Sequence, residues 1–302
     1  MGRVVVAGSI NMDVVATAGR HPKIGETIAG SKILFLPGGK GANQAIAASK
    51  LGAPATLIGC IGRDTFGRDL RSFLAATNID LTFLRDTADA GTGTAIITVA
   101  GSDNTIVVVP GANAYVNAED IAAFSFAAGD IAVSQFEIRL TVVRAFLERA
   151  HAANATTILN PAPALPCDRQ LLDFADILIL NETELGFFAR AGIGPTDDQA
   201  TIIAAARSLQ SEPRQTICVT LGERGFIALI GGEPHIEAGR PATAIDTTGA
   251  GDCFVGAVAA QLAQGRSIRE ALHYANAAAS ICVQRLGAAP SMPAVDEVAA
   301  CL

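Results

Sequence analysis

Val4-Val5-Val6-Ala7 is the first of six short apolar runs in this 302-residue chain. The other five runs are residues 56–61, 131–134, 157–159, 177–180 and 216–221. Stretches rich in Ala and Leu separate them. Strands that are apolar along their whole length and alternate with helices are typical of a parallel sheet covered on both faces. The pattern predicts a doubly wound α/β fold with a mostly parallel sheet flanked by helices.

The composition favours a soluble protein that acts on small molecules. Half of the residues are hydrophobic, 17% are charged, and the chain has 30 glycines, two Tyr and no Trp. The formal net charge is −7, and no long run of Lys or Arg occurs. A nucleic acid or an anionic membrane is therefore not an expected partner. Polar residues interrupt every apolar stretch before the roughly 18 to 20 residues that a membrane span requires.

The cysteines indicate a reducing compartment. Six are scattered along the chain without a C-x-x-C pair, and most lie in apolar runs. Buried reduced thiols behave as small hydrophobic side chains, so we expect reduced cysteines and a cytoplasmic protein. The opening Met1-Gly2-Arg3 and the apolar run after it are too short for the core of a signal peptide.

Two regions interrupt the alternation of strands and helices. Residues 26–36 form one region, and residues 92–99 and 105–109 form the other, joined by Gly101-Ser102-Asp103-Asn104. The second region is typical of a β-hairpin. We expect a single domain over 1–302 with a small β-sheet lid formed from about 12–37 and 91–110. A surface hairpin without a function is the alternative.

Polar residues and one glycine stand directly after the apolar runs. They are Asn11, Asp13, Glu137, Asn160, Asn181, Glu184 and Gly222. Polar residues often simply end strands. In open parallel sheets, however, ligands bind beyond the carboxyl ends of the strands. The repetition at successive strand ends therefore predicts a ligand site along that edge.

The run Pro37-Gly38-Gly39-Lys40-Gly41-Ala42-Asn43-Gln44 lets the backbone approach a ligand closely. It is not a Walker loop, because Gly41 follows Lys40 where Ser or Thr is required. It is not a dinucleotide fingerprint either, because Gln44 replaces the third glycine. A glycine-rich turn into a helix is the structural alternative.

The run Thr247-Thr248-Gly249-Ala250-Gly251-Asp252 precedes apolar residues at helical spacing. We therefore expect it at the N-terminus of a helix, where free N–H groups bind anions. Asp252 in the first turn could act only as a helix cap. The functional interpretation is that a phosphoryl group contacts the glycine amides while Asp252 accepts the proton of an attacking hydroxyl.

An ordered set of motifs resembles the ribokinase (PfkB-type) carbohydrate kinases over essentially the whole chain. The motifs are Gly8-Ser9-Ile10-Asn11-Met12-Asp13, the run 38–44, Gln135-Phe136-Glu137, Asn160-Pro161-Ala162-Pro163-Ala164, Asn181-Glu182-Thr183-Glu184, Thr220-Leu221-Gly222-Glu223-Arg224-Gly225, the run 246–252 and Gly287-Ala288-Ala289-Pro290-Ser291. Their order matches that of the family, which makes the resemblance specific.

The resemblance implies a role for each matching residue. Asp252 corresponds to the family's base. The anion hole corresponds to Gly249, Ala250 and Gly251. The sugar-binding set corresponds to Asn11, Asp13, Gly38, Gly39, Lys40, Asn43, Glu137 and Asp252. A sugar requires such a mixture of donors and acceptors on fixed segments.

The resemblance also implies ATP, Mg²⁺ and K⁺. The nucleotide set corresponds to Asn181, Glu184, Thr220, Gly222, Gly225, Gly251 and Asn276. Asn181 and Glu184 match an N-x-x-E motif associated with Mg²⁺ and phosphate. Asn276 stands where the family commonly has His near the adenine. A monovalent-cation site, made largely of backbone oxygens, corresponds to Asp246, Thr248, Cys282, Arg285, Gly287 and Ser291.

The implied reaction is the phosphorylation of D-ribose at its 5-hydroxyl by ATP. Deoxyribose, a hexose, a keto-deoxy sugar acid or a nucleoside are alternative acceptors, although the scarcity of Tyr and Trp disfavours a nucleoside. A non-catalytic sugar-binding module is an alternative of another class, and the presence of Asp252 opposes it. A Rossmann oxidoreductase is disfavoured because Gly8-Ser9-Ile10-Asn11 lacks the G-x-G-x-x-G spacing. The resemblance further implies a homodimer that forms through the β lid.

Overall fold

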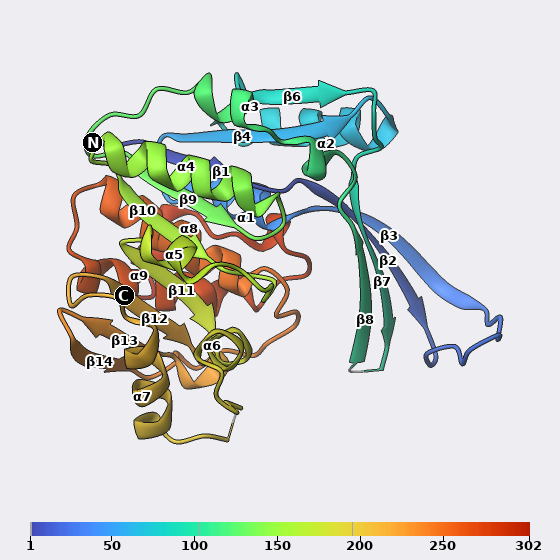
Figure 1. Ribbon diagram of the computed structural model, residues 1–302. Coiled ribbons are helices and arrows are strands. Elements are labelled where there is room, and N and C mark those ends of the chain that lie inside the picture. Colours follow the sequence, from blue (N-terminus) through green and yellow to red (C-terminus); the bar gives the residue numbers. More distant parts are fainter. Residues whose placement is uncertain (1, 102, 195) are drawn as a thin grey trace.

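The computed structural model describes residues 2–101, 103–194 and 196–302. Within these ranges the strands form a ten-stranded sheet and a separate four-stranded sheet. The larger sheet, called the main sheet below, lies inside the body of the molecule, and the smaller one projects away from it (Figure 1). The predicted α/β architecture with a small accessory sheet is confirmed.

The main sheet is parallel except at one edge. Its order is β14-β13-β12-β11-β10-β9-β1-β4-β5, with β6 also paired to β4. Among its described strands, the antiparallel pairs are β12 with β13 and β13 with β14. The strands are β1 Val4–Ala7, β4 Ala55–Gly62, β5 Ile79–Asp80, β6 Leu84–Thr87, β9 Ile131–Gln135, β10 Thr156–Asn160, β11 Ile177–Asn181, β12 Thr216–Thr220, β13 Phe226–Ile230 and β14 Glu233–Glu237. All six predicted apolar runs therefore lie on strands of the main sheet.

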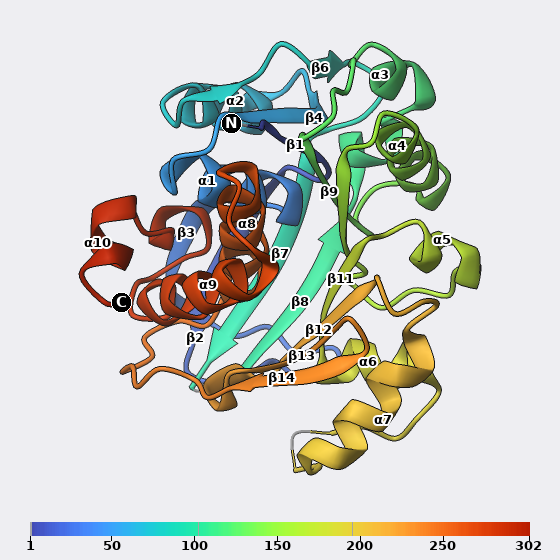
Figure 2. The same ribbon diagram turned by 90° about the vertical axis from the view of Figure 1, so that its left-hand side faces the viewer.

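Helices cover both faces of the main sheet, which explains why its central strands are apolar throughout (Figure 2). On one face, α1, α2, α8, α9 and α10 pack over one apolar core, and α3 to α7 pack over a second core on the other face. The helices are α1 Lys40–Lys50, α2 Thr65–Ala75, α3 Ala118–Ala122, α4 Leu140–Ala152, α5 Arg169–Asp173, α6 Glu182–Ala189, α7 Gln199–Leu209, α8 Ala250–Ala263, α9 Ile268–Cys282 and α10 Val295–Ala299. No helix of the described ranges is long and apolar enough to cross a membrane.

The smaller sheet, called the small sheet below, has the order β3-β2-β7-β8. Its strands are β2 Asn11–Ala18, β3 Gly30–Gly38, β7 Gly93–Ala100 and β8 Asp103–Val109. The hairpin predicted near residue 100 is present as the antiparallel pair β7 and β8. Ser102, which was predicted in its turn, lies outside the described residues. The strands fall in the two segments expected to form a lid.

The connection from β1 to β2 places the small sheet beside the carboxyl edge of the main sheet. β1 lies between β4 and β9, and the chain passes from Ala7 to Asn11 in three residues. Asn11 and Asp13 therefore lie on a strand of the small sheet, although they follow β1 directly as the sequence indicated. This junction brings side chains of both sheets together.

Candidate active site

Three neighbouring cavities line the carboxyl edge of the main sheet. The middle cavity, of about 200 Å³, has Lys40 and Asp252 in its wall. A larger cavity of about 780 Å³ shares Gly251 with it. A third cavity, of about 330 Å³, is bordered by Asn11 and Glu137. The three spaces together extend from the small sheet to the last turns of α9, which suits two substrates that meet in the middle.

The N-terminus of α8 forms the wall of the middle cavity. Asp252 is buried in its first turn. Gly249 has a φ of 80°, and a Cβ there would lie 2.8 Å from Ala288, so only glycine fits. The backbone N–H groups of Gly251 and Asp252 donate to no other described residue. Free N–H groups at a helix N-terminus attract anions. A phosphoryl group can therefore bind beside the Asp252 carboxylate.

Two amide side chains hold the Asp252 carboxylate. Asn43 Nδ2 donates to Oδ2 and Gln44 Nε2 donates to Oδ1, both at 2.9 Å. Gln44 Nε2 also donates to Asn160 Oδ1, whose own Nδ2 donates to the Ile179 carbonyl of β11. A carbonyl only accepts, so it sets the orientation of the Asn160 amide and, through it, that of Gln44. The carboxylate is thus fixed to the main sheet, and each oxygen keeps a lone pair for a substrate proton.

Charged side chains surround the space between Asp252 and the small sheet. Ser9 Oγ donates to Glu137 Oε2 at 2.5 Å, and the Lys40 backbone N–H donates to the same oxygen. Burial, with the negative charges of Glu137 and Asp252, raises the pKa of Asp13 to about 7. Burial lowers the pKa of Lys40, but the surrounding carboxylates outweigh it, so the pKa is raised overall and the ammonium stays charged.

Two glycines let the run 38–44 pass close to β2. A Cβ on Gly38 would lie 2.2 Å from Asp13 Oδ2. Gly39 has a φ of 88°, and a Cβ there would lie 2.7 Å from the Asn11 backbone nitrogen. The buried Oδ1 of Asn43, in the same run, has no hydrogen-bond partner among the described residues. An unpaired buried acceptor is costly, and a sugar hydroxyl in the cavity would satisfy it.

Asn181 and Glu184 have a structural role as well as a place in the cavity. Asn181 Oδ1 accepts from the Glu184 N–H at 2.8 Å, and Glu184 Oε2 accepts from the Asn181 N–H at 2.9 Å, which is a capping box for α6. Both residues also line the middle cavity. Burial raises the pKa of Glu184, although the Asn181 N–H and the Lys40 charge oppose that shift. The remaining oxygen of Glu184 is available to a cation.

Five of the seven residues expected to bind the nucleotide line the largest of the three cavities, and they are Thr220, Gly222, Gly225, Gly251 and Asn276. Gly225 has a φ of 90°, and a Cβ there would lie 2.1 Å from the Glu237 carbonyl oxygen. Asn276 Nδ2 donates to Glu237 Oε1 and to the Ala238 carbonyl, both at 2.8 Å. Its Oδ1 makes no hydrogen bond with the described residues. The cavity volume lies in the range typical of nucleotide-sized ligands.

Asp246 joins two loops next to the start of α8. Its Oδ1 accepts from the Thr248 N–H at 2.9 Å, and its Oδ2 accepts from the Gly287 N–H at 2.8 Å. The loop before α8 is therefore tied to the loop after α9. A displacement of either loop would therefore move the N–H groups of Gly249 to Gly251, because the loop before α8 continues directly into that helix.

Three other residues predicted to bind a monovalent cation have partners for their side chains. Cys282 Sγ and Ser291 Oγ contact each other at 2.9 Å, and Arg285 forms an ion pair with Glu297. A cation here would depend on backbone oxygens and Asp246, as the resemblance implies. No group of three or more His, Cys, Asp or Glu side chains that could hold a metal occurs among the described residues.

Several residues of the site lie outside the predicted set. Gln44 and Asn160 orient Asp252, and Ser9 contacts Glu137. Asn113 contacts Asn11 from a segment that carried no motif. Gln44 could have been proposed from its place beside Asn43, whereas the place of Asn160 at a strand end had already indicated a ligand site there, without a specific role. Asn113 had no such indication, because its contact joins residues 102 positions apart.

Comparison with known proteins agrees with this geometry. The family model described as pfkB family carbohydrate kinase matches residues 1–295. The chain is 36% identical to a ribokinase of Haemophilus influenzae, over 97% of this chain and 96% of that protein. It is 33% identical to a deoxyribokinase of Salmonella typhi, over 97% and 96%. A solved structure of Arabidopsis thaliana ribokinase complexed with ribose and ATP superposes with a TM-score of 0.88 at 34% identity, covering 99% of this chain and 98% of that one.

The match spans nearly the whole chain in both sequence and fold, and the cavities lie where the parallel strands end. The chain belongs to the PfkB family of carbohydrate kinases, and it is a ribokinase-type phosphotransferase.

Proposed function

We propose that this protein transfers the γ-phosphoryl group of ATP to the 5-hydroxyl of D-ribose, which yields D-ribose 5-phosphate and ADP. One observation carries the proposal. The buried carboxylate of Asp252 lies in the first turn of α8, beside free N–H groups, and is fixed by Asn43 and Gln44. The similarity to ribokinases favours ribose as the acceptor.

Each group of residues has its own role in the proposed reaction. Asn11, Asp13, Asn43 and Glu137 hold the sugar so that its primary hydroxyl reaches Asp252. Asp252 accepts the hydroxyl proton while the oxygen attacks the phosphoryl group, and ADP leaves. The N–H groups of Gly249 to Gly251 stabilise the negative charge on the transferred phosphoryl oxygens. In-line positioning supplies much of the rate enhancement in this class of reaction.

Two cations complete the proposal. The free oxygen of Glu184 suits Mg²⁺ held mainly through water and phosphate oxygens, and the ion would neutralise charge on the phosphates. The backbone oxygens beside Asp246 suit K⁺, which would order the loop that leads into α8. Replacement of K⁺ by a large organic cation should lower kcat. Equal activity in both salts would remove the K⁺ site from the proposal.

Two further features belong to the proposal. The protein forms a homodimer through the small sheet, whose apolar side chains are largely exposed. It functions in the cytoplasm, because its six cysteines, all within the described ranges, are free thiols.

2-Deoxyribose is the second candidate acceptor, because a deoxyribokinase is nearly as similar in sequence as the ribokinases. The experiment is a comparison of kcat/KM for D-ribose, 2-deoxyribose, fructose, a keto-deoxy sugar acid and a nucleoside, with ATP and Mg²⁺. D-ribose should give the highest value. A higher value for another acceptor would replace ribose, and no turnover with any of them would overturn the kinase assignment of the site.

A further inference from the structure

Asn113 lies at the junction of the two sheets and has no role in the reaction described above. It belongs to the short 3₁₀ helix η1, Gly111–Tyr115, which leads the chain out of the small sheet after β8. Its side chain is 1% exposed. Both polar atoms of its side chain form hydrogen bonds with Ile10 or Asn11. These two residues join the end of β1 to the start of β2.

The hydrogen bonds at Asn113 define the orientation of two amide groups. The Ile10 backbone N–H donates to Asn113 Oδ1 at 2.9 Å, and only an oxygen can accept it. Asn113 Nδ2 must therefore face the Ile10 carbonyl and Asn11, to which it donates at 3.3 and 2.7 Å. The Asn11 atom that receives this N–H must be its Oδ1. The Nδ2 of Asn11, which has no partner among the described residues, is then left to face the cavity.

The backbone of β7 packs closely against the side-chain amides of Asn11 and Asn113. Gly93, at the start of β7, packs against both amides, and a Cβ there would lie 2.2 Å from Asn113 Nδ2 and 2.3 Å from Asn11 Oδ1. Asn11 and Asn113 also line the same cavity of about 330 Å³. The first residues of β2 and β7 therefore meet η1 through these two side chains.

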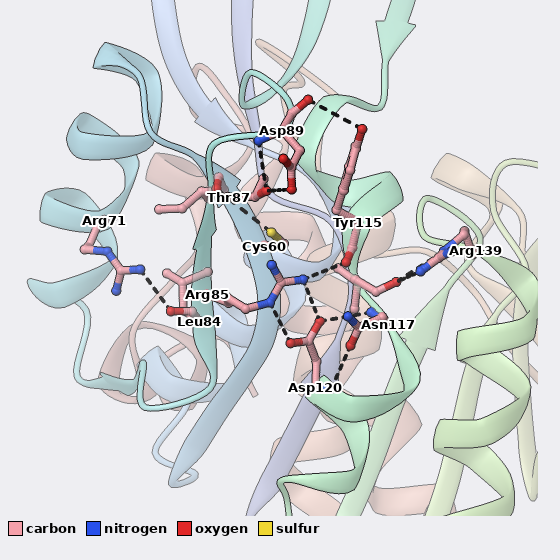
Figure 3. A network of polar contacts seen from close by, with 12 residues as sticks. Cys60, Arg71, Leu84, Arg85, Thr87, Asp89, Tyr115, Asn117, Asp120 and Arg139 are labelled. Carbon is pink, nitrogen blue, oxygen red and sulfur yellow. Dashed lines mark hydrogen bonds and ion pairs between the residues drawn. The ribbon is translucent and has the colours of Figure 1, made fainter.

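Two arginines hold the segment that carries Asn113 (Figure 3). Arg85 donates to the Tyr115 carbonyl at 2.7 Å and pairs with Asp120. Arg139 donates to the Val116 carbonyl at 2.8 Å. Upstream, the Ala112 N–H donates to the Gly91 carbonyl at 2.8 Å. Hydrogen bonds thus hold the backbone of η1 on both sides of Asn113. The side-chain amide of Asn113 therefore keeps a fixed position, and it fixes the orientation of the Asn11 amide.

We propose that Asn113 is a positioning residue that fixes Asn11 as a hydrogen-bond donor to the sugar. The inference rests on the proposed function. Asp13 and Glu137 offer carboxylate oxygens, which accept hydrogen bonds from sugar hydroxyls. Each hydroxyl that donates to a carboxylate keeps lone pairs, and the Asn11 Nδ2 can donate to one of them. A sugar therefore binds best when Asn11 is a donor, because an amide oxygen in its place would add a third acceptor.

The test is the variant Asn113→Asp, which keeps the shape and the acceptor for Ile10 N–H but replaces the donor to Asn11 by an acceptor. Asn11 then turns its Nδ2 toward residue 113 and presents its oxygen to the sugar. The KM for ribose should rise by about tenfold, since one hydrogen bond in the site is lost and an acceptor faces an acceptor. The KM for ATP should stay unchanged.

A double-mutant cycle separates positioning from a general loss of structure. In an Asn11→Ala background, Asn113→Asp should change the ribose KM by less than about twofold, because the amide it orients is gone. Asn113→Ala provides a second variant in case a carboxylate at this buried position prevents folding. Asn117→Ala is the matched control, because Asn117 caps α3 in the same segment and does not contact Asn11.

The outcomes distinguish this inference from the proposed function. An unchanged ribose KM in a folded Asn113 variant would overturn the positioning role, and so would an equal rise in both backgrounds. A rise of the same size in Asn117→Ala would also overturn it, since loss of the cap alone would then explain the effect. If the unaltered protein phosphorylates no pentose, the proposed function fails instead.

Discussion

The two sheets have similarly apolar strands but opposite exposure. All eight residues of β4 in the main sheet are buried, whereas all seven residues of β8 in the small sheet are exposed. Helices of the same chain cover both faces of the main sheet, while the small sheet projects from the body (Figure 1). In the main sheet, the helices that cover both faces explain why the strands are apolar. In the small sheet, the apolar strands leave an exposed surface of a kind that is typical of association sites.

The strand register divides the small sheet into two faces. Asp13, Ala95 and Val108 pair directly across β2, β7 and β8, and directly paired side chains share a face. Asp13 and Ala95 are buried, and Val108 borders the cavity beside Asn11, so this face is turned toward the site.

The next row in the register lies on the opposite face. It consists of Phe35, Val14, Ile96 and Val107. Phe35, Ile96 and Val107 are 54%, 50% and 61% exposed. The small sheet therefore turns one face toward the candidate site and exposes an apolar surface on its other face.

The largest expected effect concerns the edge of the main sheet. Asp252→Asn should lower kcat by about 10² to 10⁴-fold, because an amide cannot accept the hydroxyl proton. The sugar dissociation constant should change by only about twofold to threefold, since Asn43 can turn its amide and present Oδ1 to the new NH2 group. Steady-state kinetics and calorimetry measure the two quantities.

Asp296→Asn is the control for that variant, because Asp296 lies exposed in the first turn of another helix, α10. It should leave kcat unchanged. Near-normal turnover of Asp252→Asn would mean that Asp252 only caps α8 and that the base lies elsewhere.

An intermediate effect is expected at the small sheet. Val107→Glu should raise the dimer dissociation constant by at least about tenfold, since a buried unpaired carboxylate costs more than the ~1.4 kcal/mol that corresponds to tenfold. Sedimentation over a range of concentrations measures it. Ile236→Glu is the matched control, because Ile236 is an exposed apolar residue on β14, the edge strand of the main sheet. A monomeric unaltered protein, or equal effects of the two variants, would contradict association through the small sheet.

The smallest expected effect is a pH dependence at Asp13. Its pKa of about 7 means that the carboxyl group is protonated in mildly acidic solution. The ionised form accepts more hydrogen bonds from a sugar, so the ribose KM should fall several-fold as the pH rises through about 7. Asp13→Asn should abolish this dependence, and the KM for ATP serves as the control. A ribose KM that is equally pH-dependent in Asp13→Asn would assign the titration to another group.

The same shift predicts how stability depends on pH. The folded state holds the Asp13 proton more tightly than the unfolded state, in which the pKa is about 4. The contribution of Asp13 to the free energy of unfolding should therefore decrease as the pH rises from about 4 to about 7. Asp13→Asn should remove this contribution, which urea unfolding at several pH values would measure.

Much of the fold was predictable because it depends on near neighbours in the sequence. Apolar runs predicted six of the ten described strands of the main sheet, and the glycine-rich run before Asp252 predicted the start of α8. The capping box of Ser267 and Glu270 at the start of α9 is another signal of this local kind. Periodicity and capping act within a few residues, so they can be recognised without knowing where the chain goes next.

The sequence by itself determined the elements, the place of Asp252 in a first helical turn and, through ordered motifs, the family. Only the tertiary structure decided which side chains orient the chemistry. Gln44 and Asp252 are 208 positions apart, and Asn11 and Asn113 are 102 apart. Such contacts depend on how the two sheets meet, and an amide has a defined orientation only when its partners are in place. That is why the local sequence does not show which side chain each of these residues orients.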